Sequence, residues 1–264
     1  MSAELRIVGL QTDLHWRNPD ANLAHFDALL ATISAGSCDV VILPEMFTTG
    51  FSWPPLDPTN GPGSDVAWMQ TWADRLGAAI AGSVACLDAD NQPRNRFWFV
   101  PPTEEGTATP YDKRHLFTVA GEHDHFKAGD HRVEVEFRGF RILLQVCYDL
   151  RFPVFVRNDH PEPYDLAIYV ANWPETRSSA WRTLLQARAI ENQCFVVGIN
   201  RSGTDGNGHR YAGDSLMADF AGALLSDAGG DGQPATLQAT LRQEDMMAFR
   251  RKLPFLEDAD ACKG

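Results

Sequence analysis

The spacing of apolar residues changes along the chain between the period of a strand and that of a helix. Residues 5–10 (LRIVGL) form a short apolar run rich in strand formers. A capping residue, Asn18, is followed by proline and by apolar residues at helical spacing, and Gly36 stands where a left-handed residue would end that helix. Residues 39–44 have the pattern of a buried strand, and 64–77 repeat the capped-helix pattern. We therefore predict the order strand, helix, strand, helix for this part.

The same alternation continues through the rest of the chain. The further elements predicted are strands over 79–86 and 97–100, a polar loop over 103–110, a hairpin over 132–146 that turns at Arg138 and Gly139, a strand over 165–170, a Ser-capped helix from about Ser179 to Asn192, a strand over 194–200, a tight loop over 205–208 and a helix from about Gln243. Strands that alternate with helices favour a layered α/β fold.

Composition narrows the class of protein. The 264 residues include 44% hydrophobic residues and scattered prolines, which favours one large domain over residues 1–264. No apolar run is long enough to span a bilayer, and the N-terminus lacks the pattern of a signal peptide, so we expect a cytoplasmic protein that does not bind membranes. A formal net charge of -12 without a basic cluster opposes nucleic-acid binding.

The five cysteines are odd in number and contain no CxxC pair, which favours reduced thiols over a disulfide framework. Cys86 and Cys194 lie inside apolar strand runs, where a thiol usually acts as a small core side chain. Cys38 is predicted in a loop and Cys262 in the tail. Cys147 differs because it stands at the junction between a predicted strand and a turn.

Three residues with reactive chemistry stand where apolar strands end: Glu45, Lys113 and Cys147. Ligands bind at such strand ends in open α/β sheets. A thiol attacks efficiently as a thiolate, so a hydrolase built on Cys147 needs a base to take the proton and a cation to favour the negative charge. Glu45 and Lys113 suit these roles, although each residue alone is more often structural.

Three segments resemble the signature blocks of the nitrilase superfamily: LPEMFTTGF at 43–51, YDKRHLF at 111–117 and VCYDLRFP at 146–153. Further blocks with the same resemblance, in the expected order, are AGEH at 120–123, ANWPETR at 171–177, ARAIENQ at 187–193 and GDS at 213–215. The combination is most similar to the omega-amidase branch, whose members deamidate 2-oxoglutaramate and 2-oxosuccinamate. The resemblance implies a four-layer α-β-β-α sandwich and, through one face of it, a homodimer or a larger homo-oligomer.

The resemblance also implies the roles of individual residues. Glu45, Lys113 and Cys147 would form the catalytic triad, and Glu122 would be a supporting second carboxylate. Cys147 would attack the amide carbon while Lys113 and the backbone N–H of Tyr148 stabilise the oxyanion. Glu45 would protonate the leaving ammonia and then activate the water that hydrolyses the thioester. No metal or organic cofactor is expected.

Substrate binding rests on weaker patterns. Phe117, Asn172 and Trp173 resemble residues that line the pocket in this superfamily. An omega-amide of a keto diacid carries a carboxylate that requires a cationic or N–H partner. Candidates for that partner are Arg151, Arg177 and Arg201. Asp149 and Arg151 could also orient the turn after the nucleophile through an ion pair.

Several alternatives stay open. Glu122, which neighbours His123, Asp124 and His125, could be a solvated loop residue, and histidines nearby could suggest a metal site, although their spacing matches no helical zinc motif. A nitrilase or an N-carbamoyl amidohydrolase would use the same triad on a different substrate. A non-catalytic binding protein on the same fold is a further alternative, but it would have no physical need for an acid, a cation and a thiol together.

Overall fold

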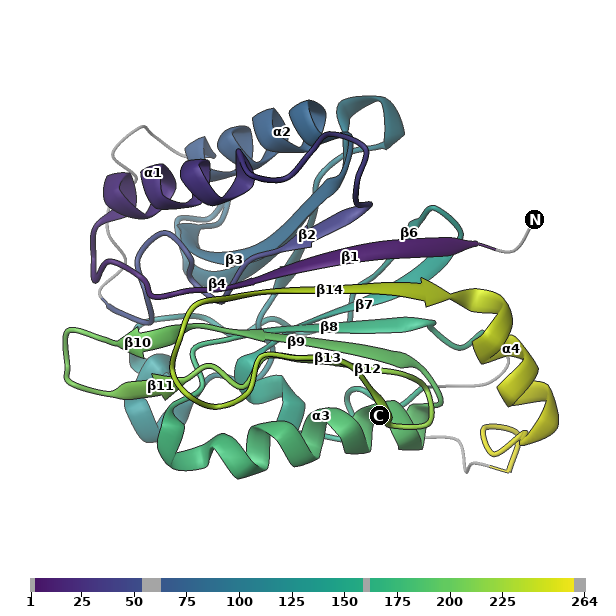
Figure 1. The fold of residues 1–264 in the computed structure, drawn as a ribbon. Coiled ribbons are helices and arrows are strands. Elements are labelled where there is room, and N and C mark those ends of the chain that lie inside the picture. Colours follow the sequence, from purple (N-terminus) through teal and green to yellow (C-terminus); the bar gives the residue numbers. More distant parts are fainter. Residues whose placement is uncertain (1–2, 54–62, 159–161, 259–264) are drawn as a thin grey trace.

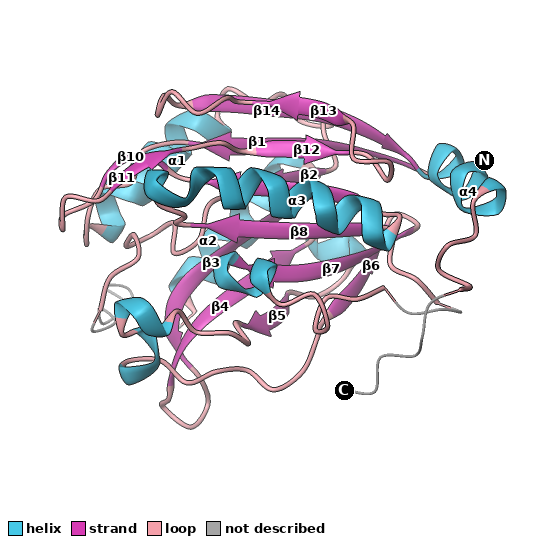
Figure 2. Ribbon diagram, turned by 90° about the horizontal axis from the view of Figure 1, so that it is seen from below, coloured by secondary structure: helices cyan, strands magenta, loops and turns pink. Residues whose placement is uncertain are grey.

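Two β-sheets packed face to face form the centre of the molecule, and helices cover their outer faces (Figure 1). The computed structural model describes residues 3–53, 63–158 and 162–258. Helices α1 (Pro19–Leu30) and α2 (Ser64–Leu76) lie on one sheet, and α3 (Ser178–Asn192) lies across the outer face of the other, as Figure 2 shows from below. The predicted four-layer α-β-β-α sandwich is therefore confirmed.

The first sheet has six strands in the order β14-β1-β2-β3-β4-β5. Their bounds are β1 Glu4–Gln11, β2 Val40–Ile42, β3 Ala79–Leu87, β4 Pro93–Val100, β5 Thr109–Asp112 and β14 Ala235–Arg242. Strands β1, β2 and β3 run parallel to one another, whereas β14 pairs antiparallel with β1 and β4 pairs antiparallel with β3.

The second sheet also has six strands, in the order β13-β12-β9-β8-β7-β6. Their bounds are β6 Glu134–Phe137, β7 Phe140–Val146, β8 Leu166–Ala171, β9 Phe195–Asn200, β12 Leu216–Ala218 and β13 Leu224–Asp227. Strands β7, β8 and β9 are parallel. A separate two-stranded ribbon consists of β10 Ser202–Thr204 and β11 Arg210–Ala212.

Two helix ends have the residues that the sequence predicts there, the start of α1 and the end of α2. The four α-helices are α1 Pro19–Leu30, α2 Ser64–Leu76, α3 Ser178–Asn192 and α4 Gln243–Lys252. The short 3-10 helices are η1 Thr103–Glu105, η2 Thr118–Ala120, η3 Glu122–Asp124, η4 Cys147–Arg151 and η5 Glu175–Arg177. Asn18 caps α1 by accepting a hydrogen bond from the backbone of Ala21, and Gly77 ends α2 in the left-handed conformation. No helix in the described residues is long and apolar enough to cross a membrane.

Strand β1 shows how the alternating pattern builds two separate cores. Leu5 and Ile7 point into the core between the sheets, whereas Val8 and Leu10 pack under α1 and α2. At Gly9 a Cβ atom would lie only 2.2 Å from Ile199 Cδ1 of the facing sheet. Glycine at this position therefore allows the two sheets to approach closely.

Some boundaries differ from the prediction. Helix α1 ends at Leu30, well before Gly36, because the following residues form tight turns; Gly36 is nevertheless left-handed, with φ of +72°. Helix α3 has Arg177 at its N-cap position with no side-chain cap, so the predicted serine cap is wrong. The predicted polar loop over 103–110 contains η1 and the first residues of β5. The prediction also missed β10 to β14.

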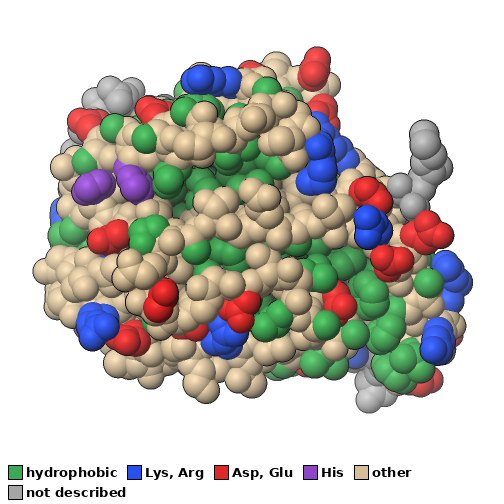
Figure 3. Space-filling model, in the orientation of Figure 1, with side chains coloured by type: hydrophobic (Ala, Val, Ile, Leu, Met, Phe, Trp, Pro, Cys, Tyr) green, Lys and Arg blue, Asp and Glu red, His purple; other side chains and the backbone are tan. Residues whose placement is uncertain are grey.

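Charged side chains of both signs are interspersed on the face that Figure 3 shows.

The predicted hairpin over 132–146 is present as β6 and β7, joined at Arg138 and Gly139, which both have positive φ. This is the geometry of a two-residue primed turn, which matches the twist of the flanking strands. The hairpin leads directly to Cys147.

Candidate active site

Each of the three predicted catalytic residues directly follows a strand or stands a few residues after it. Glu45 comes after β2, Lys113 immediately after β5 and Cys147 immediately after β7. The backbone of Cys147 is left-handed, with φ of +47°, and Met46 next to Glu45 has φ of +44°. Such conformations are costly for residues other than glycine and cluster at functional sites. Both sharp turns place the adjoining side chains at the strand ends.

A buried ion network joins Glu45, Lys113 and Glu122. Lys113 Nζ lies 2.8 Å from Glu45 Oε1 and 2.9 Å from Glu122 Oε2, and all three side chains are completely buried. Burial opposes the lysine charge, but the Glu122 and Glu45 carboxylates outweigh this effect and raise the pKa of Lys113. Lys113 is therefore an ammonium at neutral pH.

Glu122 is a member of this network, so the alternative of a solvated loop residue is wrong. Besides Lys113, it accepts hydrogen bonds from the backbone N–H of Phe117, at 2.6 Å, and from Asn95 Nδ2, at 3.0 Å. Burial raises the pKa of Glu122, and Glu45 adds to that effect, whereas Lys113 and the hydrogen bonds oppose it. Glu122 thus holds Lys113 together with Glu45.

Sequence analysis missed two polar residues that support the network, Asn95 on β4 and Ser83 on β3. Asn95 Nδ2 donates to Glu45 Oε1 at 2.8 Å, and its Oδ1 accepts from Ser83 Oγ at 2.9 Å. Ser83 Oγ in turn accepts from the backbone N–H of Met46 at 2.9 Å. Both are fully buried polar residues in strands, which usually need fixed partners. Ser83, a polar residue inside the predicted strand over 79–86, carried a signal that could have identified it, whereas Asn95 lies before the predicted strand over 97–100 and carried none.

Cys147 is buried beside these charges, with 8% of its surface exposed. Burial raises the pKa of the Cys147 thiol well above its usual value, the charges of Glu45 and Glu122 raise it further, and Lys113 acts in the opposite direction. The resting thiol is therefore protonated at neutral pH. Attack by the sulfur requires a base beside it to take the proton, and Glu45 is in that position.

Asp149 holds the turn that carries the nucleophile, but not through Arg151. Its carboxylate accepts from the hydroxyl of Tyr111 at 2.8 Å, from the backbone N–H of Val146 at 3.1 Å, and from the backbone and ring nitrogen of His115 at 2.9 and 2.8 Å. Asp149 is completely buried. The predicted ion pair with Arg151 is therefore absent, and Asp149 instead ties η4 to the segment around Lys113.

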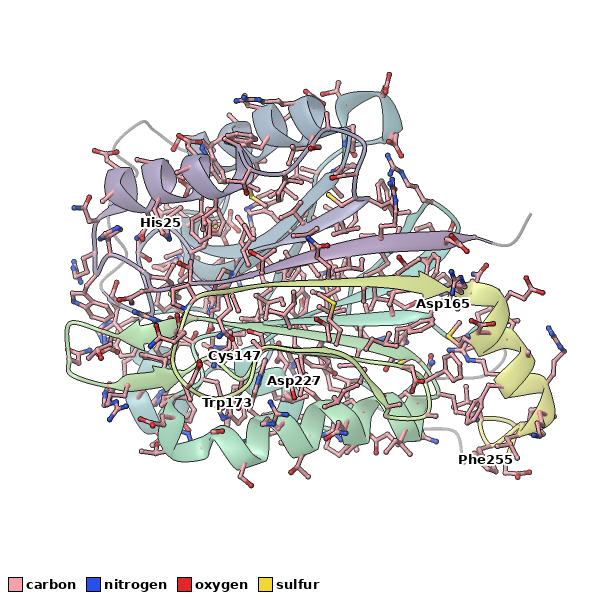
Figure 4. All side chains as sticks on the ribbon, viewed as in Figure 1. His25, Cys147, Asp165, Trp173, Asp227 and Phe255 are labelled. Atoms are coloured by element: carbon pink, nitrogen blue, oxygen red, sulfur yellow. The ribbon has the colours of Figure 1, made fainter. Side chains whose placement is uncertain are left out.

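A small cavity that opens to solvent reaches Cys147. Its described lining residues are Phe51, Phe117, Cys147, Tyr148, Arg151, Asn172, Trp173, Pro174 and Arg177. Figure 4 shows Cys147 and Trp173 close together. The predicted substrate-binding residues Phe117, Asn172, Trp173 and Arg151 thus line one cavity with the nucleophile. An aromatic wall with a few polar groups is typical of a pocket for a small molecule.

Two arginines of this cavity have no carboxylate partner among the described residues. The guanidinium of Arg151 lies 4.8 Å from the ring centroid of Trp173, and that of Arg177 lies 5.0 Å from the ring centroid of Phe117. The third candidate, Arg201, does not line the cavity; it is fully buried and forms an ion pair with Asp13. Arg201 is therefore structural.

The remaining predicted residues have other roles. Cys194 is fully buried, and Cys38 is nearly so, in a loop as predicted, while Cys86 is half-buried on β3. Cys262 lies outside the described residues. In the described part of the chain, no group of three or more His, Cys, Asp or Glu side chains is arranged to hold a metal ion.

Comparison with known families identifies the class to which this site belongs. The family model described as carbon-nitrogen hydrolase matches residues 4–251. The chain therefore belongs to the carbon-nitrogen hydrolase family.

Individual relatives cover almost the whole chain. It is 49% identical to the "Omega-amidase YafV" of Yersinia enterocolitica over 256 residues, which cover 97% of each protein. It is 31% identical to the "2-oxoglutaramate amidase" of Bacillus subtilis, with 94% of this chain and 95% of the relative covered. Among solved structures, it is similar to XC1258 from Xanthomonas campestris, a "CN-hydrolase Superfamily Protein with an Arsenic Adduct in the Active Site". That similarity has a TM-score of 0.88 and 43% identity over 98% of both chains.

Proposed function

We propose that this protein is an omega-amidase, which hydrolyses the terminal amide of a small keto diacid monoamide such as 2-oxoglutaramate to a carboxylate and ammonia. The observation that carries the proposal is the buried Glu45–Lys113–Glu122 network beside Cys147 at the floor of an aromatic cavity. Relatives of nearly full length that are named omega-amidase and 2-oxoglutaramate amidase support the amide substrate. They do not favour the nitrilase, N-carbamoyl amidohydrolase or non-catalytic alternatives.

In the first half-reaction, Cys147 is acylated. Glu45 takes the thiol proton as Sγ forms a bond to the amide carbon, and the carbonyl oxygen becomes an oxyanion. Lys113 Nζ and the backbone N–H of Tyr148 stabilise that oxyanion by charge and hydrogen bonding. The C–N bond then breaks, Glu45 returns its proton to the nitrogen, and ammonia leaves a thioester on Cys147.

In the second half-reaction, water releases the acid. Glu45 takes a proton from the water as the water oxygen bonds to the thioester carbon. This step again produces an oxyanion beside Lys113. The C–S bond then breaks, and the thiolate of Cys147 regains the proton from Glu45. The product, which now has a second carboxylate, is free to leave. One carboxylate thus serves as acid and base in turn, while Glu122 positions Lys113 throughout.

Arg151 and Arg177 bind the carboxylate at the far end of the substrate. Both are cations that line the cavity with Cys147, and each rests on an aromatic ring that lines the same cavity. An anionic group between them would neutralise two guanidiniums that lack a protein carboxylate partner in the described residues. Phe117 and Trp173 enclose the carbon chain between the amide and this carboxylate.

Ammonia release tests the proposal. Purified protein should release ammonia from 2-oxoglutaramate far faster than from a nitrile or from an N-carbamoyl amino acid. Preference for either of the latter substrates would reject the omega-amidase assignment. We further expect a cytoplasmic homodimer built from single-domain chains, and light scattering would measure the oligomer size.

A further inference from the structure

One residue that lines the cavity, Asn172, has a buried hydrogen-bond acceptor that the proposed mechanism does not use, its side-chain Oδ1. Asn172 follows β8, is 4% exposed and lines the cavity together with Cys147. Seven buried side-chain polar atoms in the described residues have no hydrogen-bond partner, and among them only this oxygen belongs to a residue of that cavity. Buried acceptors normally have a partner, so an unpartnered one beside a nucleophile indicates a group that binds there.

The orientation of the Asn172 amide follows from its other contacts. Its Nδ2 lies 2.5 Å from the backbone carbonyl oxygen of Glu45, and its backbone N–H donates to Glu45 Oε2 at 2.7 Å. A carbonyl oxygen can only accept, so the nitrogen must face Glu45 and the oxygen must be the free atom. Asn172 thus donates two hydrogen bonds to Glu45, the general base, and its Oδ1 remains available to accept one.

We infer that Asn172 Oδ1 accepts a hydrogen bond from the amide N–H of the substrate and so selects amides over esters and nitriles at this site. The inference rests on the proposed function and adds a residue that recognises the leaving nitrogen. A primary amide has two N–H groups, and the base Glu45 can accept only one of them in the geometry of attack.

The hydrogen bond from the substrate N–H to Asn172 Oδ1 becomes stronger during the reaction. The nitrogen gains a proton from Glu45 as the tetrahedral intermediate breaks down, and an N–H that becomes more positive binds a carbonyl acceptor more strongly. The alkoxy oxygen of an ester has no hydrogen to donate and would face Asn172 as a second acceptor. A nitrile nitrogen likewise offers no donor, so the contact discriminates by chemical class rather than by size.

The test compares an amide and an ester that carry the same acyl group. We would measure kcat/KM, which reports acylation, for 2-oxoglutaramate and for the omega-methyl ester of 2-oxoglutarate in wild type and in Asn172→Ala. Loss of the acceptor should lower the amide-to-ester ratio by roughly tenfold, the scale of one buried hydrogen bond. A purely structural role, through the contacts to Glu45, would lower both values by the same factor and leave the ratio unchanged, which would overturn the inference.

Asn200 is a matched control. Its side chain accepts a hydrogen bond from the backbone N–H of Trp173 at 2.8 Å and donates one to the backbone carbonyl of Trp173 at 2.9 Å. Asn200 is not among the residues that line the cavity. Asn200→Ala should lower amide and ester hydrolysis equally. Should Asn172→Ala fail to fold, Asn172→Ser, which also removes the amide oxygen but keeps a polar side chain, serves for the same comparison. A wild type that hydrolyses the ester but no amide would reject the proposed function as well, whereas an active amidase with an unchanged ratio would reject only the role of Asn172.

Discussion

Replacement of Glu122 by glutamine tests whether this carboxylate positions Lys113. Each Glu122 oxygen accepts two hydrogen bonds, one of them from Lys113 Nζ; the others come from Asn95 Nδ2 and the Phe117 N–H. Whichever way the glutamine amide is turned, its NH₂ group faces two donors, so two of the four bonds are lost. At about 1.5–3 kcal/mol for each bond to a charged group, the total loss is about 3–6 kcal/mol.

That loss should affect both folding and catalysis. If about 3 kcal/mol of this lost free energy destabilises the transition state, kcat/KM for ammonia release decreases by about 100-fold. The thiol gives an independent signal, because the charge of Glu122 contributes to the raised pKa of Cys147. Removal of that charge lowers the pKa, so the pH profile of iodoacetamide alkylation at Cys147 should shift to lower pH in Glu122→Gln.

Asp149→Asn is the matched control for this experiment. Asp149 is a buried carboxylate that also accepts four hydrogen bonds, but none of them comes from Lys113. The substitution should lower thermal stability and should shift the alkylation profile less than Glu122→Gln does, because the main charges that act on the pKa of Cys147 are those of Glu45, Lys113 and Glu122. A Glu122→Gln protein that keeps the wild-type kcat/KM and the wild-type alkylation profile would show that Glu122 does not position Lys113.

Three further predictions concern the nucleophile and the substrate carboxylate. Cys147→Ala should abolish ammonia release while thermal unfolding stays cooperative, whereas Cys86→Ala should keep turnover; an active Cys147→Ala protein would exclude thioester chemistry. Arg151→Leu and Arg177→Leu should each raise KM for 2-oxoglutaramate by about 10- to 100-fold, the scale of a charge-assisted contact, in steady-state kinetics, and an unchanged KM in both would place the carboxylate elsewhere. Because burial raises the pKa of Cys147, its thiolate fraction grows with pH, so the alkylation rate should still rise above pH 9; a plateau near pH 6 would instead indicate a resting thiolate.

Local patterns predict much of this fold because they depend on neighbours in sequence. The helix over 64–77 and the turn at Arg138 and Gly139 are specified by capping and by residues that tolerate positive φ. Strand β14 was missed although its pattern was readable. Ala235, Leu237, Ala239 and Leu241 face the core and alternate with exposed polar residues, which is the period of a half-buried strand.

In the candidate site, too, local patterns predict some features, whereas the packing of distant segments determines the others. Signature blocks located Glu45, Lys113 and Cys147, but no local pattern shows that Glu122 loses all contact with solvent or that Asn95 bridges two carboxylates from another strand. Those facts depend on how distant segments pack. The choice between Arg177, at the cavity, and Arg201, buried against Asp13, depends on packing for the same reason.

The proposed hydrolysis depends on a reactive sulfur at Cys147. Stoichiometric iodoacetamide labelling, followed by peptide mass mapping and an ammonia-release assay on the same sample, tests it directly. We predict that one label per chain on Cys147 abolishes ammonia release from 2-oxoglutaramate and that the product 2-oxoglutarate slows the labelling. Full activity in protein labelled at Cys147 would contradict the account.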